Sequence, residues 1–149
     1  MKKYIYSLVA ALALSFGFVS CGDDDDTITF STSAEQGSAG TYSGTWSKTA
    51  NGNEATATGT VTLAAASAAN NTNVTFSCTE FELDATSIAN VTHASNGYVF
   101  NNNATANPLG AGFTGKIGED GTIQVNFQKE VREGRTRTIY IFKFIGKKN

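Results

Sequence analysis

Few side chains of this 149-residue chain are of the types that carry out nucleophilic or metal chemistry. The sequence contains two cysteines, Cys21 and Cys78, and a single histidine, His93. Cys78 with His93 would be a thiol–imidazole nucleophile, but one histidine and one cysteine do not make a metal site of the usual spacing. Because Cys78 is in step with Val74 and Phe76 in an expected strand, we predict a buried thiol. We therefore expect no catalytic residue, no metal and no cofactor, and hence no enzyme.

An acidic cluster offers another kind of chemistry. Glu80, Glu82 and Asp84 are two residues apart, so on an extended strand they would share one face. Carboxylates in that arrangement could bind calcium or cleave glycosidic bonds. The predicted strands carry no second acidic cluster and no aromatic platform, and we interpret these carboxylates as a solvated outer face.

A glycine-rich segment and a group of basic residues could also indicate binding sites. Gly110 to Gly115 matches the dinucleotide fingerprint literally, but that motif needs a preceding strand and a following helix, and neither is expected here. Basic side chains flank the turn at Glu133-Gly134, namely Lys129, Arg132, Arg135 and Arg137. They indicate a charged hairpin tip that keeps a strand edge soluble, or a contact for an acidic glycan or partner.

The elements that would position these residues are short strands. Turn pairs recur at about 8–12 residues with alternating segments between them, which favours a barrel or a sandwich. Asn51-Gly52 is the strongest hairpin signal, and Asn96-Gly97, Asp120-Gly121 and Glu133-Gly134 follow it. The strands predicted are Thr41–Lys48, Glu54–Leu63, Val74–Leu83, Ser87–Thr92, Tyr98–Asn101, Phe113–Ile117, Ile123–Val131 and Arg135–Ile145.

This number of antiparallel strands closes into a small barrel whose interior is filled or holds one small ligand. Ala64–Asn73 and Asn102–Ala111 do not fit as strands, and we expect loops at the rim. Within Val74–Leu83 the buried phase switches, which predicts a bulge. In the last strand Lys143 shares a face with isoleucines, so the aromatic residues are placed inside, namely Tyr140, Phe142 and Phe144.

The first 20 residues have the features of a secretory leader. Lys2 and Lys3 precede the apolar stretch Ile5–Val19, whose 15 residues are fewer than the about 20 that a spanning helix needs. Phe18-Val19-Ser20-Cys21 resembles the lipobox of bacterial lipoproteins. This resemblance implies cleavage before Cys21 and membrane attachment through lipid on that cysteine. The alternative is an ordinary leader that a cysteine happens to follow.

An acidic segment follows the cysteine. Asp23–Asp26 are four adjacent carboxylates that repel one another, which predicts a solvated tether. After a lipidated cysteine they resemble the surface-export signal of Bacteroidetes lipoproteins, which implies an outer-membrane anchor exposed at the cell surface. The alternative is an anchor that faces the periplasm. Asp26-Thr27-Ile28 resembles the O-glycosylation site of the same phylum and makes Thr27 a candidate.

Two segments of the mature chain carry a family resemblance. Tyr42-Ser43-Gly44-Thr45-Trp46 contains the Gly-x-Trp that opens lipocalins and fatty-acid-binding proteins, and Tyr140–Lys147 is similar to the closing strand of calycin-like domains in Bacteroidetes lipoproteins. The resemblance implies an all-β, antiparallel eight-stranded calycin-like barrel, with Trp46 plugging its closed end. Arg137 or Arg135 would stack across that tryptophan by cation–π attraction. The lipocalin disulfide is missing.

These expectations define three parts: a leader over residues 1–20, a lipidated acidic tether over 21–40 and the barrel over 41–149. The leading hypothesis is a surface-anchored, non-enzymatic lipoprotein whose barrel holds a small hydrophobic ligand. The candidate lining residues are Trp46, Phe127, Tyr140, Phe142 and Phe144. The alternative is a structural module of an outer-membrane complex that meets a protein or glycan through its rim loops. With 11 basic and 13 acidic residues, the sequence has no nucleic-acid-binding footprint.

Overall fold

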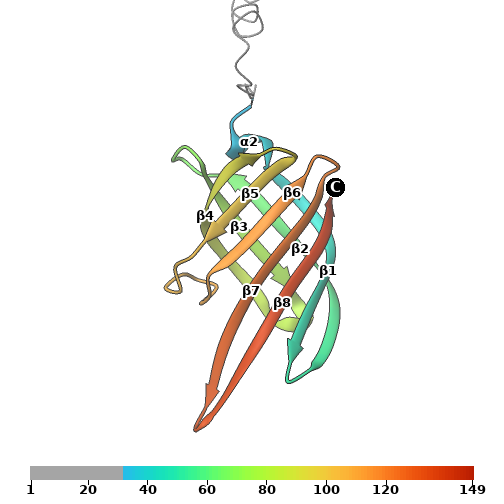
Figure 1. Ribbon diagram of the computed structural model, residues 1–149, viewed down its shortest axis with the longest axis vertical. Helices are drawn as coiled ribbons and strands as arrows, with labels where there is room; N and C mark the ends of the chain where they lie inside the picture. The colour runs from blue at the N-terminus through green and yellow to red at the C-terminus, as the bar shows by residue number, and fades with distance from the viewer. Residues whose placement is uncertain (1–31) are drawn as a thin grey trace, which may run out of the picture. The chain divides into compact units, whose positions relative to one another are not determined.

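Eight antiparallel strands form a closed barrel in chain order, in a computed structural model that describes residues 32–149 (Figure 1). Each strand pairs with the next, and β8 pairs back with β1. The strands are β1 (Gly40–Ala50), β2 (Asn53–Ala65), β3 (Asn71–Cys78), β4 (Leu83–Ala94), β5 (Gly97–Asn102), β6 (Phe113–Gly118), β7 (Thr122–Glu133) and β8 (Thr136–Lys148). The predicted all-β, eight-stranded antiparallel barrel is confirmed. The predicted leader, the lipid on Cys21, the Asp23–Asp26 tether and the candidate Thr27 lie outside the described residues.

Because successive strands run in opposite directions, their connections fall at two ends of the barrel (Figure 1). One end carries the short helix α2 (Ala34–Gly37), the loop at residues 66–70 and the turns at 95–96 and 119–121. The other, which we call the open end, carries the turn at 51–52, the 3₁₀ helix η1 (Thr79–Phe81), the loop at 103–112 and the turn at 134–135. The two loops predicted at the rim therefore lie at opposite ends and cannot form one contact surface.

The turn between β1 and β2 follows from its sequence. Asn51 and Gly52 have φ angles of 50° and 80°, and both positions of a two-residue hairpin turn of this kind need positive φ. Ala50 and Asn53 close the pair. The predicted Asn-Gly hairpin is confirmed.

The predicted bulge within Val74–Leu83 is wrong. β3 ends at Cys78, η1 follows, and β4 begins at Leu83, so the change of buried phase marks a corner between two strands. Glu82 takes the left-handed conformation with φ of 54°. Glycine or asparagine is the usual residue at such a position, and its absence from the sequence removed the turn signal.

Aromatic rings fill the middle of the barrel. The Trp46 ring centroid lies 4.8 Å from that of Phe144, 5.9 Å from that of Phe127 and 6.1 Å from that of Phe76. Phe127 stacks on Phe142 with their centroids 4.7 Å apart. Since Trp46 and Phe144 have no exposed surface, these rings are packed against one another as a protein core and leave no room for a ligand among them.

Two glycines make room for buried rings, one for Trp46 and one for Phe100. A Cβ atom at Gly59 would lie 2.6 Å from Cδ1 of Trp46, and one at Gly115 would lie 2.0 Å from Cζ of Phe100. Real Cβ atoms do not approach other atoms so closely, because the repulsion between them is too strong. Both strands therefore need glycine where a ring lies against the backbone.

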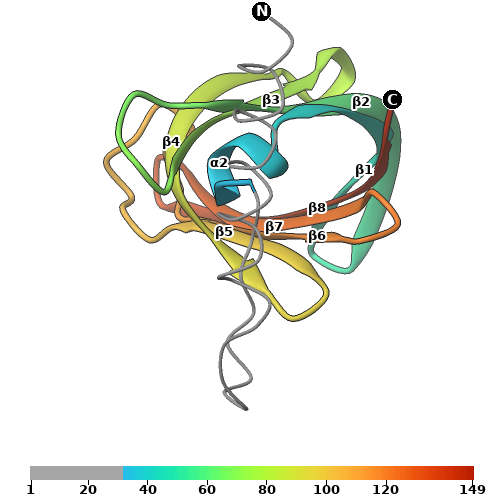
Figure 2. The same ribbon diagram turned by 90° about the horizontal axis from the view of Figure 1, so that it is seen from above.

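The helix α2 covers the end of the barrel at which the chain enters, and Figure 2 shows it within the ring of strands. Ala34 is buried, and the Tyr42 hydroxyl donates a 2.7 Å hydrogen bond to the carbonyl oxygen of Ser38. The backbone N–H of Asn70 donates a 3.2 Å hydrogen bond to the Glu35 carboxylate, which connects the helix to the loop at 66–70. Residues 34–38 thus pack with the barrel, whereas the sequence predicted a linker as far as residue 40.

The loop at 103–112 also belongs to the core. Leu109 and Ala111 are buried, and the Asn107 side-chain amide donates to the carbonyl oxygens of Ala104 and Ala111 at 2.7 and 2.9 Å. These bonds satisfy backbone groups inside the loop and hold its apolar residues against the strands. The loop therefore closes part of the open end, and its buried residues Leu109 and Ala111 are not available to contact a partner.

Tyr42 predicts a pH dependence of stability. Burial raises the pKa of its hydroxyl to about 12, above the value of about 10 for an unfolded chain. Burial of the neutral hydroxyl therefore contributes fully to the free energy of unfolding below about pH 10. This contribution, of up to about 3 kcal/mol, is lost as pH rises towards 12. Urea unfolding at pH 9 and pH 11.5 measures it. The Tyr42→Phe variant, which cannot ionise there, should lose less stability over this interval, and an equal loss in both proteins would refute the assignment.

Leu109 predicts that the loop at 103–112 contributes to stability. Leu109→Ala should lower the free energy of unfolding by about 2–4 kcal/mol, because it leaves a cavity beside the strands. Thr105→Ala, at an exposed position of the same loop, is the control and should change stability by less than about 0.5 kcal/mol. Chemical denaturation measures both. Equal midpoints for the two variants would mean that the loop is not part of the core.

Candidate functional site at the open end

A hollow of about 220 Å³ lies at the open end, between η1 and the base of the β7–β8 hairpin. Its walls come from β1, η1, the start of β4 and the two strands of that hairpin. The lining residues are Lys48, Phe81, Glu82, Leu83, Lys129, Val131, Tyr140 and Phe142. Segments far apart in the chain therefore meet here.

Strand alternation places Lys48 in this hollow. Lys48 follows Trp46 by two residues on β1, so both side chains point to the inside of the barrel. Trp46 lies in the aromatic core, whereas Lys48 lies nearer the open end, opposite Phe142 of β8. The floor of the hollow is Phe142, whose ring stacks on Phe127 of the core.

Three aromatic rings surround the Lys48 ammonium. Its Nζ atom lies 4.6 Å from the Tyr140 ring centroid and 5.8 Å from those of Phe81 and Phe142. Such contacts attract the cation through the negative faces of the rings. Lys129, the register partner of Tyr140, brings a second ammonium group to the hollow. Within residues 32–149 no ion pair occupies either lysine.

The β7–β8 hairpin extends past the rest of the barrel (Figure 1). Its strands remain paired from Gln128 and Ile141 to Glu133 and Thr136, but β6 pairs with β7 only as far as Phe127. Likewise β1 pairs with β8 only as far as Ile141. The hairpin is a two-stranded ribbon beyond these points, and its partly buried face forms one wall of the hollow.

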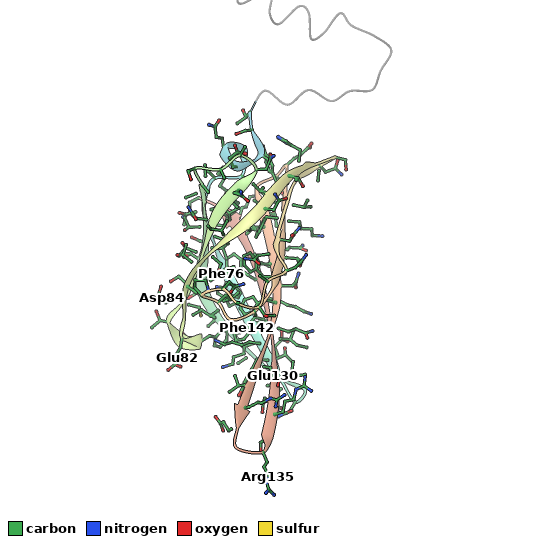
Figure 3. All side chains as sticks on the ribbon, turned by 90° about the vertical axis from the view of Figure 1, so that its left-hand side faces the viewer. Phe76, Glu82, Asp84, Glu130, Arg135 and Phe142 are labelled. Carbon is green, nitrogen blue, oxygen red and sulfur yellow. The ribbon has the colours of Figure 1, made fainter. Side chains whose placement is uncertain are left out.

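Ion pairs lie on the opposite face of the ribbon. The Glu130 carboxylate oxygens lie 2.6 Å from Nε of Arg132 and 2.7 Å from Nη2 of Arg137. The hydrogen bond from Arg132, and then that from Arg137, holds the pKa of the Glu130 carboxyl below its usual value. All three side chains are exposed, so we assign these pairs little stability. Figure 3 shows Glu130 on the ribbon and Arg135 at its tip.

The expected pairing of Trp46 with an arginine is not present. Arg137 is engaged by Glu130, and its register partner is Arg132 near the tip of the ribbon. Trp46 lies opposite Phe144, deep in the barrel, and its Nε1 atom has no hydrogen-bond partner. Arg137 lies near the tip of the ribbon and Phe144 lies in the core, so the length of β8 between them keeps the Arg137 guanidinium away from the Trp46 indole.

The five candidate lining residues divide between two places. Trp46, Phe127 and Phe144 belong to the filled core, whereas Phe142 and Tyr140 line the hollow at the open end. Sequence reasoning missed Lys48, although its alternation with Trp46 was a usable signal. It also missed Phe81 and Leu83, because the change of buried phase within Val74–Leu83 predicted a bulge and not a corner.

The other candidates are dispersed. Cys78 is buried and free, as predicted. Its cross-strand partner Leu83 begins β4, and His93 is ten residues further along that strand, about 33 Å away at the usual rise. The His93 Nε2 atom lies 3.1 Å from the Thr32 carbonyl oxygen. A Cys78–His93 nucleophile is therefore not formed.

The acidic cluster does not lie on one strand face. Glu80 is in η1, Glu82 is in its left-handed cap and Asp84 is on β4, so a corner separates their directions (Figure 3). No group of three histidine, cysteine or acidic side chains in the described part of the chain could hold a metal ion. The glycine pattern at Gly110–Gly115 leads into β6 and not into a helix.

No helix among residues 32–149 has the length and apolar character needed to cross a membrane. Comparison of the chain with protein-family models, with curated protein sequences and with solved structures finds no match. The functional argument therefore rests on the fold and on the geometry of the hollow.

Proposed function

We propose that this protein is a surface-anchored, non-enzymatic lipoprotein of the calycin-like type found in Bacteroidetes, and that its open end binds a small amphiphilic anion. The observation that carries the proposal is the position of the Lys48 ammonium among the rings of Phe81, Tyr140 and Phe142. A cation on an apolar floor suits a ligand with a short apolar body and one acidic group.

The size of the hollow supports a short ligand. Its volume of about 220 Å³ is below the roughly 300–1,000 Å³ of pockets that hold drug-sized molecules. The packed rings of Trp46, Phe127 and Phe144 leave no passage into the barrel. A long acyl chain would have to remain outside, so we expect ligands of about the length of octanoate.

The charges of the hollow favour an anion. Lys48 and Lys129 are opposed by one carboxylate, that of Glu82, among the lining residues. An anion that enters would meet ammonium groups that no acid among residues 32–149 already pairs with. We assign binding and not catalysis to the hollow, because Cys78 and His93 lie elsewhere.

The anchor supports access to this site from the medium. The resemblance of Cys21 and Asp23–Asp26 to a lipidated export signal suggests a lipid anchor exposed at the cell surface. The chain enters the barrel beside α2, and the hollow lies at the other end. The described segment that continues towards the anchor is therefore distinct from the residues that line the hollow.

Calorimetric titration tests the proposed ligand class. We expect octanoate to bind at least about ten-fold more tightly than octanol, a difference of about 1.4 kcal/mol, because only the carboxylate pairs with Lys48. Lys48→Met keeps an apolar stem and should abolish this preference. Lys116→Met, which removes an exposed ammonium on the outer face of β6, is the matched control and should retain it.

Equal binding of the two ligands, or an unchanged preference in Lys48→Met, would show that Lys48 does not recognise an anion. Native mass spectrometry of the protein from its own membrane provides an independent measurement. A small molecule that dissociates, apart from the covalent lipid on Cys21, would support the binding function. Absence of any ligand there, together with no binding of either probe, would reject it.

A further inference from the structure

The outer face of β8 differs from the rest of the barrel surface. Alternate residues of this strand point outward, and they are Arg137, Ile139, Ile141, Lys143, Ile145 and Lys147, which we call the β8 face. The side chains between them include Phe142 and Phe144 of the core. Ile139 and Ile145 are 44% and 60% exposed, so large apolar groups alternate with cations in water.

The neighbouring strands place no acid beside Lys143, the cation at the middle of this face. On β7 the partners of Ile141, Lys143 and Ile145 are Gln128, Asn126 and Gln124. On β1 the partners of Lys143 and Ile145 are Ser47 and Thr45. Acids lie near both ends of the β8 face: Glu130, opposite Ile139, is engaged by Arg132 and Arg137, and Asp120 has its pKa lowered by hydrogen bonds from Thr122 and in part by the charge of Lys147. The middle of this face therefore has positive charge and no acid.

The same face has a depression of about 520 Å³ between β6, β7 and β8. Outward side chains of the two longer strands line it, among them Asn126, Gln128, Ile141 and Lys143. Amide donors and an ammonium group there could contact an anionic group that approaches from outside.

The barrel surface from β1, next to β8, round to β4 is chemically different. The outward residues of β1 to β4 are mainly hydroxyl side chains, which bond to each other across strands, as Thr41 with Thr62 at 3.2 Å and Thr75 with Thr86 at 2.8 Å. Ile88 of β4 is 58% exposed there, among polar neighbours. Exposed isoleucine alone thus does not distinguish the β8 face, whereas its combination with cations does.

We propose that the β8 face binds the anionic lipid headgroups of the membrane that carries the anchor. Exposed isoleucines can enter the boundary between headgroups and acyl chains, while lysine and arginine contact phosphates. A single face with both groups, and with no acid around Lys143 at its middle, has the complementary charge for that surface. This binding is independent of any ligand in the hollow, because Lys48 and Tyr140 point to the inside of the barrel.

Co-sedimentation with vesicles tests this proposal. The chain from residue 21 onward with Cys21→Ser keeps every described residue and cannot be acylated. We expect it to bind vesicles of phosphatidylglycerol with phosphatidylcholine and not vesicles of phosphatidylcholine alone. Binding should weaken from 50 to 500 mM salt, because mobile ions screen the attraction.

Variants locate the contact. Lys143→Gln with Lys147→Gln should weaken binding to the anionic vesicles by roughly thirty-fold, about five-fold for each cation. Ile139→Ser with Ile145→Ser should weaken it by roughly ten-fold. Ile88→Ser changes an equally exposed isoleucine on the hydroxyl side and should have no effect. Lys48→Met should also bind normally, which separates this surface from the hollow.

Failure of the unmodified chain to bind anionic vesicles would overturn the proposal, as would full binding by both β8 variants. Size-exclusion chromatography with light scattering examines a second copy as the occupant. Concentration-dependent dimers that Ile139→Ser with Ile145→Ser abolishes, without vesicle binding, would assign the face to self-association and reject the membrane contact.

Discussion

The pairing of β8 with β1 is the constraint on which the rest of the structure depends. It turns a meander of hairpins into a closed barrel in which every strand has two neighbours through its middle. Closure divides all side chains into an inner and an outer set, because alternate residues must point to opposite sides. Lys48 and Phe142 face the hollow for this reason, and Lys143 and Ile145 face the surroundings.

Closure also explains why the ribbon formed by β7 and β8 projects beyond the barrel wall. The barrel wall has the length of its shorter strands, and β7 and β8 continue after their neighbours have ended. An isolated two-stranded hairpin is marginally stable in water, so the ribbon depends on its continuity with the wall and on the contacts across the hollow. The binding site we propose and the support of the ribbon thus use the same side chains, notably Tyr140 and Val131.

Much of the fold could be predicted from the sequence, because alternation and turn residues act locally. Ile123, Val125 and Phe127 alternate with polar residues, and each is buried on β7. The β3–β4 corner could not be predicted in this way, since Glu82 occupies a left-handed position without a glycine or asparagine. The hollow was beyond local reasoning as well, because it joins Lys48, Phe81 and Tyr140 across three distant segments. An arginine was wrongly expected beside Trp46, because spacing does not reveal how far β8 extends beyond the barrel.

The order of the strands has a consequence for how the barrel folds. Each strand pairs with the one before it in the chain, so seven of the eight ladders join neighbours in the chain and can form without the strands that follow them. The eighth ladder joins Tyr42 to Lys148 and cannot form until the last residues are present. Until then β1 exposes an unpaired edge of hydroxyl-bearing residues, including Ser43 and Thr45. Their polarity lowers the tendency of this edge to aggregate while the chain waits for its final strand.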